Sequence, residues 1–103
     1  MYKLCFFVPE SHCEAVKNVV FEAGAGRQGD YDCCSWQVLG KGQFRPLKGS
    51  KPFIGEEGEV ERVAEFRVEM LCDSSNIKGV VHALKKAHPY EEPAFEVYRL
   101  EEV

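Results

Sequence analysis

The residues of this chain that could do chemistry gather in residues 88–94, near its C-terminal end. The segment holds an imidazole, a phenol and two carboxylates between two prolines: His88, Pro89, Tyr90, Glu91, Glu92 and Pro93. An imidazole with carboxylates can bind zinc or copper when a third ligand joins them. Each proline restricts its own φ and the residue before it, so we expect a rigid turn. This turn is either a preorganised ligand or metal rim, or only a stiff corner with solvated acids.

A second candidate region is the long segment between Gly42 and Gly58. It carries three cations and two aromatic rings, contributed by Phe44, Arg45, Lys48, Lys51 and Phe53. Unstructured segments of this length are uncommon in small domains and are often functional. We predict that it holds an anionic small molecule or a partner, against the corner formed by residues 88–94. The alternative is a flexible excursion between two strands.

The elements around these regions follow from hydrophobic periodicity. Residues 2–8 alternate as a strand, and Ser11 with Glu14 forms a capping-box pattern before a helix whose apolar stripe includes Val16 and Val20. Residues 33–39 predict a second strand that ends at Gly40 and Gly42. The strongest alternation runs over residues 60–72, with one apolar face and one charged face, which is typical of an antiparallel sheet.

The C-terminal part repeats the strand and helix pattern. Asp73 and the two serines after it can cap a second helix with an apolar stripe from Ile77 to Ala87, and residues 95–100 predict a fourth strand. The order strand, helix, strand, strand, helix, strand predicts a single α+β domain over residues 1–103. We expect a ferredoxin-like fold, with a four-stranded antiparallel sheet and both helices on one face. The other face, with Cys5 and Phe7, would be bare and would favour self-association.

The remaining histidines and the cysteines give weaker signals. His12 lies beside a helix start that capping already explains, and His82 lies among lysines on the polar side of the second helix. The cysteines are odd in number and have no Cys-x-x-Cys spacing: Cys5, Cys13, Cys33, Cys34 and Cys72. In a strand, Cys33 and Cys34 would point to opposite faces, so at most one could serve a pocket. We therefore expect reduced thiols that act mainly as small hydrophobic residues, in a cytoplasmic protein.

Composition and charge exclude several classes of function. The 103 residues include 17 acidic and 13 basic residues, which gives a formal charge of −4, and no basic run interrupts the chain. Nucleic-acid binding is therefore not expected, although RNA-recognition domains share this order of elements. The apolar N-terminal stretch is too short for a signal peptide or a membrane span.

Two longer motifs resemble a known family. The run from His88 to Tyr98, together with the two parts of the long segment at residues 42–47 and 50–55, is similar to the inserted domain of YqfO-type members of the Nif-three-like family. The resemblance extends from the first predicted strand to the last. It implies a CutA-like and PII-like fold, with oligomerisation and small-molecule or metal sensing.

The family's flanking metal-binding lobes have no counterpart here, so a stand-alone copy of the inserted module is expected and the hydrolase-like similarity to a GTP cyclohydrolase is not carried over. We predict a non-enzymatic, homo-oligomeric binding or regulatory module for a small molecule or a partner. Its candidate ligand-binding residues are Phe44, Arg45, Lys48, Lys51, Phe53, His88, Tyr90, Glu91 and Glu92. One alternative is a divalent metal as cofactor, bound by His88, Glu91 and Glu92. The other is a small enzyme acting at the same corner.

Overall fold

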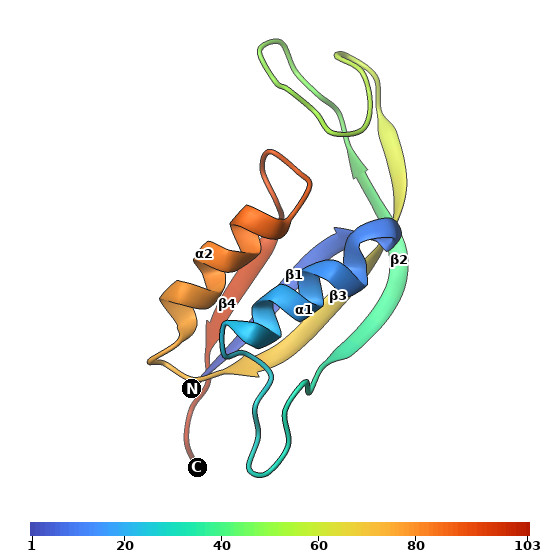
Figure 1. Cartoon of the computed structure of the whole chain (residues 1–103). Helices are drawn as coiled ribbons and strands as arrows, with labels where there is room; N and C mark the ends of the chain where they lie inside the picture. Colours follow the sequence, from blue (N-terminus) through green and yellow to red (C-terminus); the bar gives the residue numbers. More distant parts are fainter.

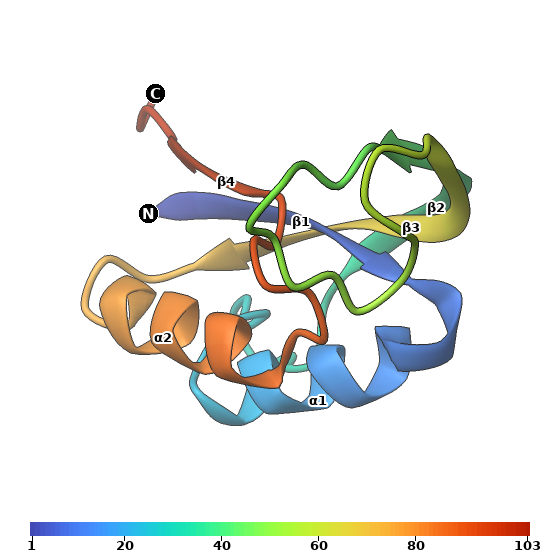
Figure 2. The same ribbon diagram turned by 90° about the horizontal axis from the view of Figure 1, so that it is seen from above.

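In the computed structural model, which describes residues 1–103, four strands form one antiparallel sheet with the order β2-β3-β1-β4 (Figure 1). Both helices cover the same face of this sheet (Figure 2). The predicted ferredoxin-like α+β fold is therefore confirmed. The elements are β1 Tyr2–Pro9, the 3₁₀ turn η1 Glu10–His12, α1 Cys13–Glu22, β2 Trp36–Phe44, β3 Glu61–Cys72, α2 Ile77–Ala87 and β4 Phe95–Arg99.

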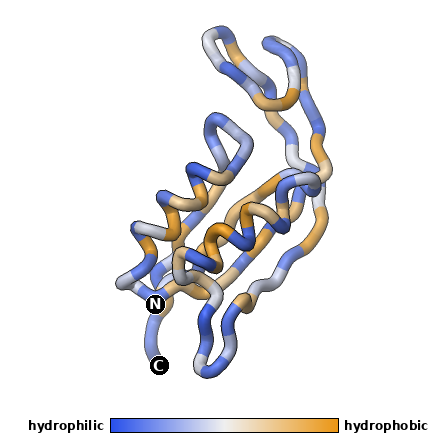
Figure 3. The backbone as a smooth tube through the Cα atoms, in the orientation of Figure 1, coloured by the Kyte–Doolittle hydropathy of each residue, from blue (hydrophilic) through white to orange (hydrophobic).

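The core lies between the sheet and the two helices. Alternate residues of the central strand β1, namely Leu4, Phe6 and Val8, are fully buried there. They meet the apolar stripes predicted for α1 and α2, which contribute Val16, Val20, Val80 and Leu84. On β3, Val68, Met70 and Cys72 join the same core, and Figure 3 shows hydrophobic residues recurring along both helices. This single core fixes both ends of β1 and thereby also positions the adjacent residues 88–94.

The β2–β3 hairpin extends beyond the two-layer core. Residue pairs run from Trp36 opposite Glu69 to Phe44 opposite Glu61, and the hairpin carries the long loop, residues 45–60, past the ends of the helices (Figure 1). The molecule is correspondingly elongated, with extents of 46 × 25 × 24 Å. The long loop folds back toward residues 88–94, which we call the His88 corner (Figure 2).

The prediction for β2 was wrong at both ends. The strand begins at Trp36 and continues through Gly40 and Gly42 to Phe44, because pairing with β3 supplies the hydrogen bonds that weak local propensity does not. Cys33 and Cys34 precede the strand, and Cys33 has a positive φ of 54°. These two cysteines therefore do not alternate across a strand, contrary to the prediction.

The capping box predicted at Ser11 is also absent. The chain first makes the turn η1, and α1 begins at Cys13 with His12 at its N-cap and no side-chain capping bond. The Ser11 hydroxyl instead lies 2.8 Å from His12 Nδ1. A similar change occurs before α2, where the Asp73 carboxylate accepts a hydrogen bond from the Ser75 backbone N–H rather than capping the helix directly.

The face of the sheet away from the helices carries Cys5 and Phe7, as predicted. The strand register places Cys5 opposite Glu69 of β3 and Glu96 of β4, and Cys5 is fully buried. The Arg67 guanidinium lies 5.9 Å from the centroid of the Phe7 ring. This face therefore combines apolar groups with charged side chains that cover them. Neither helix has the length and apolarity needed to cross a membrane.

Candidate functional site

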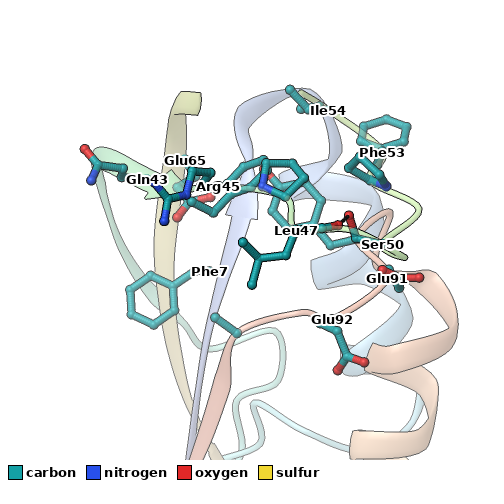
Figure 4. Close-up of a pocket in the computed structure, with 15 residues that line it drawn as sticks. Phe7, Gln43, Arg45, Leu47, Ser50, Phe53, Ile54, Glu65, Glu91 and Glu92 are labelled. Carbon is teal, nitrogen blue, oxygen red and sulfur yellow. Dashed lines mark hydrogen bonds between the residues drawn. The ribbon is translucent and has the colours of Figure 1, made fainter. Parts of the chain in front are cut away.

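The long loop and the His88 corner enclose a cleft of about 410 Å³ (Figure 4). We call it the loop cleft. Strand ends form its floor, the long loop forms one wall and the corner forms the other (Figure 4). Its lining residues are Phe7, Gln43, Phe44, Arg45, Pro46, Leu47, Ser50, Pro52, Phe53, Ile54, Glu65, Tyr90, Glu91, Glu92 and Ala94.

Backbone hydrogen bonds hold the walls of the loop cleft in place. The Gly58 N–H donates to the Pro46 carbonyl at 2.8 Å and closes the base of the long loop. The Lys51 N–H donates to the Glu91 carboxylate at 3.2 Å and ties the loop to the corner. The corner is joined to the sheet where the Phe7 N–H donates to the Ala94 carbonyl at 3.1 Å. Three segments distant in sequence therefore meet at this site.

Aromatic rings gather around Tyr90. Its ring centroid lies 5.9 Å from that of Phe44, 6.3 Å from that of Phe53 and 5.0 Å from that of His88. The Phe53 ring also meets the His12 ring edge-on at 5.4 Å. Such tilted and edge-on arrangements are favourable between rings. They join the long loop, the corner and η1 into one aromatic cluster beside the loop cleft.

His88 supports the corner from inside the protein. Its Nε2–H donates to the Phe7 carbonyl at 2.7 Å, and its Nδ1 accepts from the Tyr90 backbone N–H at 3.1 Å. This pair of bonds requires the neutral imidazole. Burial lowers the pKa of His88, an effect that the bond to the Phe7 carbonyl partly opposes and the charge of His12 reinforces. His88 therefore positions Tyr90 rather than lining the loop cleft.

Two polar side chains of the cleft wall are partly buried, and one of them has an atom without a hydrogen-bond partner. The Tyr90 hydroxyl is buried without a hydrogen bond. Burial raises the pKa of Tyr90, and the charges of Glu65 and Glu61 raise it further. Burial also raises the pKa of Glu65, whose carboxylate lies where a side chain at Gly42 would be, since a Cβ there would clash with Glu65 Oε1. Gly42 thus makes room for this carboxylate.

The loop cleft contains most of the predicted ligand-binding residues. Phe44, Arg45, Phe53, Tyr90, Glu91 and Glu92 line it, whereas Lys48, Lys51 and His88 do not. Sequence reasoning missed Phe7 and Glu65. It assigned both to the sheet face away from the helices, and nothing in their local sequence indicates that the loop and corner enclose one end of that face. Gly42, interpreted as a strand breaker, was the available signal for a close approach by another side chain.

The metal alternative at the corner stays a prediction. Both ring nitrogens of His88 are engaged by backbone groups, and the Glu91 carboxylate accepts a hydrogen bond from Lys51. No three His, Cys, Asp or Glu side chains are placed together to hold a metal ion.

Burial raises the pKa values of the Cys5, Cys13 and Cys72 thiols, and none of the five cysteines lines the loop cleft.

Comparison with known proteins places this fold in context. No protein-family model matches the chain. Curated relatives from Mycobacterium tuberculosis and Bacillus subtilis, each called a GTP cyclohydrolase 1 type 2 homolog, are 51% and 45% identical over 95% and 97% of the chain. The chain spans about a quarter of their length, 26% and 27% respectively. A Bacillus cereus protein related to NIF3 superposes with a TM-score of 0.83 at 39% identity, covering 98% of this chain and 26% of that one.

The chain is related to one segment of the Nif-three-like proteins. The resemblance predicted from the two motifs is thereby confirmed over nearly the whole chain. Proteins of CutA type share the fold of this chain. Those from Archaeoglobus fulgidus, a periplasmic divalent cation tolerance protein, and from Nostoc sp. PCC 7120, a PII-like protein, both have TM-scores of 0.70. They are 19% and 20% identical and cover 100% and 98% of this chain, which spans 87% and 82% of theirs.

Proposed function

We propose that this Nif-three-like segment is a non-enzymatic binding module that holds a small molecule in the loop cleft and associates with copies of itself. The observation that carries the first part is the cleft itself, whose volume lies in the range of small-molecule sites. Seven of its fifteen lining residues are hydrophobic, and the others place polar and charged groups among them.

Binding is favoured over catalysis by the roles that the reactive side chains already have. Nucleophilic catalysis needs a Cys or Ser beside a free base. His88 has both nitrogens in hydrogen bonds, and the Ser50 hydroxyl in the cleft wall donates to the Leu47 carbonyl at 2.6 Å. These contacts suit a rigid receptor. The curated relatives are named for GTP cyclohydrolase, but this chain spans about a quarter of their length, so we do not extend that activity to it.

A fragment screen with a cleft-filling variant tests the small-molecule part. Ala94 lines the loop cleft and is exposed, so Ala94→Phe should occupy the cleft without disturbing the core. Fragments that bind the wild type, detected by ligand-observed NMR, should bind Ala94→Phe at least about tenfold more weakly, the equivalent of about 1.4 kcal/mol. Ala15→Phe, on the exposed side of α1, is the matched control. Equal binding to both variants would remove the loop cleft from the proposal.

A further inference from the structure

The charges that line the loop cleft differ from those of the loop as a whole. Three of its lining residues carry a carboxylate, Glu65 on β3 and Glu91 and Glu92 on the corner, against one guanidinium, that of Arg45 (Figure 4). The side chains of Lys48 and Lys51 do not line it. The anionic ligand expected from the loop sequence therefore meets a wall with an excess of negative charge.

The carboxylate of Glu65 belongs to the most buried residue of the three. It forms no ion pair, since the ion pairs present join Lys3 to Glu69, Lys17 to Glu14 and Arg67 to Glu69. It is also partly buried, and burial raises its pKa. A hydrogen-bond donor on a ligand would compensate this carboxylate. Glu91, by contrast, already accepts from Lys51.

The aromatic rings give the same region an electron-rich lining. Phe44 and Phe53 flank Tyr90, with ring centroids 5.9 and 6.3 Å from it, and Phe53 is more than half exposed. Aromatic faces attract ammonium groups, more strongly when water is excluded. Leu47, also exposed, projects into the loop cleft and adds apolar surface (Figure 4). This combination suits a cationic group on an apolar stem better than a hydrated metal ion.

We propose that the loop cleft binds an organic cation: a primary ammonium group carried on a short aromatic or apolar stem. The inference rests on the proposed binding function and names the ligand class of that site. The ammonium group would donate a hydrogen bond to the Glu65 carboxylate. The stem would pack against Phe44, Phe53 and Leu47, and Glu92 would add negative potential at the opposite wall.

Three probes of similar shape and different charge test the ligand class: 2-phenylethylamine, 2-phenylethanol and 3-phenylpropanoate. Each is titrated into ¹⁵N-labelled protein at pH 7, and Kd is taken from the shifts of backbone amides around the loop cleft. The amine should bind most tightly. Glu65→Gln should weaken amine binding by about tenfold or more, because it removes a charge-assisted hydrogen bond, and should leave the alcohol nearly unchanged. Glu57→Gln, on the long loop outside the cleft, is the matched control.

The outcomes separate the ligand class from the binding function. If the alcohol or the propanoate binds the cleft as tightly as the amine, the cation inference is overturned while the binding function stands. If the amine binds equally to wild type and Glu65→Gln, the inference is likewise overturned. If none of the three probes shifts the cleft amides, the inference fails, and the fragment screen with Ala94→Phe decides the binding function separately.

Discussion

At the scale of single residues, His88 shows how one side chain can organise a site that it does not line. Its two ring nitrogens connect the end of β1 to the backbone of Tyr90. The orientation of Tyr90, and through it the aromatic cluster, depends on these two bonds. His88 is thus a positioning residue, although its motif suggested a ligand site. The groups that can contact a ligand lie on either side of it.

His88 should make the protein less stable in mild acid. Because burial lowers its pKa in the folded state below the unfolded value of about 6.5, the unfolded chain binds the proton more readily. The stabilisation is complete above about pH 6.5 and is lost as the pH falls toward the lower folded value. Urea unfolding between about pH 5 and 8 should show this decline in the free energy of unfolding.

Substitution of His88 tests the same account. His88→Gln should lower the free energy of unfolding at pH 7 by about 1–3 kcal/mol, because buried partners are left unpaired, and should flatten the decline in acid. His82→Gln, at an exposed position on α2, is the matched control. An identical pH dependence in wild type and His88→Gln would show that other groups cause the decline.

At the scale of elements, the sequence predicted best where one periodicity dominated. The α2 stripe from Ile77 to Ala87 and the alternation along β3 gave elements that the structure reproduces within about a residue. Both patterns report burial against a single core, so local sequence contains the information. The predicted start of β4 at Phe95 was equally accurate, because prolines mark the preceding corner.

The sequence predicted least where contacts between elements decide the structure. β2 passes through two glycines because β3 provides its hydrogen bonds, which no local pattern reveals. The cleft lining by Phe7 and Glu65 depends on the strand register and on the path of the long loop back to Glu91. Residues on the loop and corner could be proposed from their types, whereas their partners on the sheet could not.

The connection from α1 to β2 offers a prediction about one glycine. Gly26 has a φ of +75°, donates its N–H to the Leu71 carbonyl at 2.8 Å, and would place a Cβ 2.7 Å from the Phe21 ring. Gly26→Ala should therefore cost about 1–2 kcal/mol for the backbone conformation and about 1–3 kcal/mol more for the steric contact.

The matched control for this glycine is Gly49→Ala in the long loop. Gly49 also has a positive φ, +92°, but open space surrounds its Cβ position, so only the conformational cost should remain. Chemical denaturation of both variants measures the difference. Equal loss of stability in the two would mean that the chain around Gly26 relaxes to accept the methyl group.

At the scale of the whole molecule, the sheet leaves the outer edge of one long strand unpaired. β2 lies at the edge of the sheet, and its Trp36, Val38 and Leu39 side chains are 60%, 44% and 51% exposed. Unpaired backbone groups and exposed apolar side chains on an edge strand favour pairing with another chain. These features support the self-association in the proposed function, with β2 as part of the contact.

A charge placed on this strand tests that part of the proposal. Wild-type protein should sediment as an oligomer in analytical ultracentrifugation, and Val38→Lys should shift it toward the monomer, because a desolvated lysine opposes edge pairing. Val60→Lys is the matched control, since Val60 is also 44% exposed but lies outside the strands. A wild-type monomer at all concentrations would overturn self-association. An oligomer unchanged by Val38→Lys would move the contact away from β2 while leaving self-association in place.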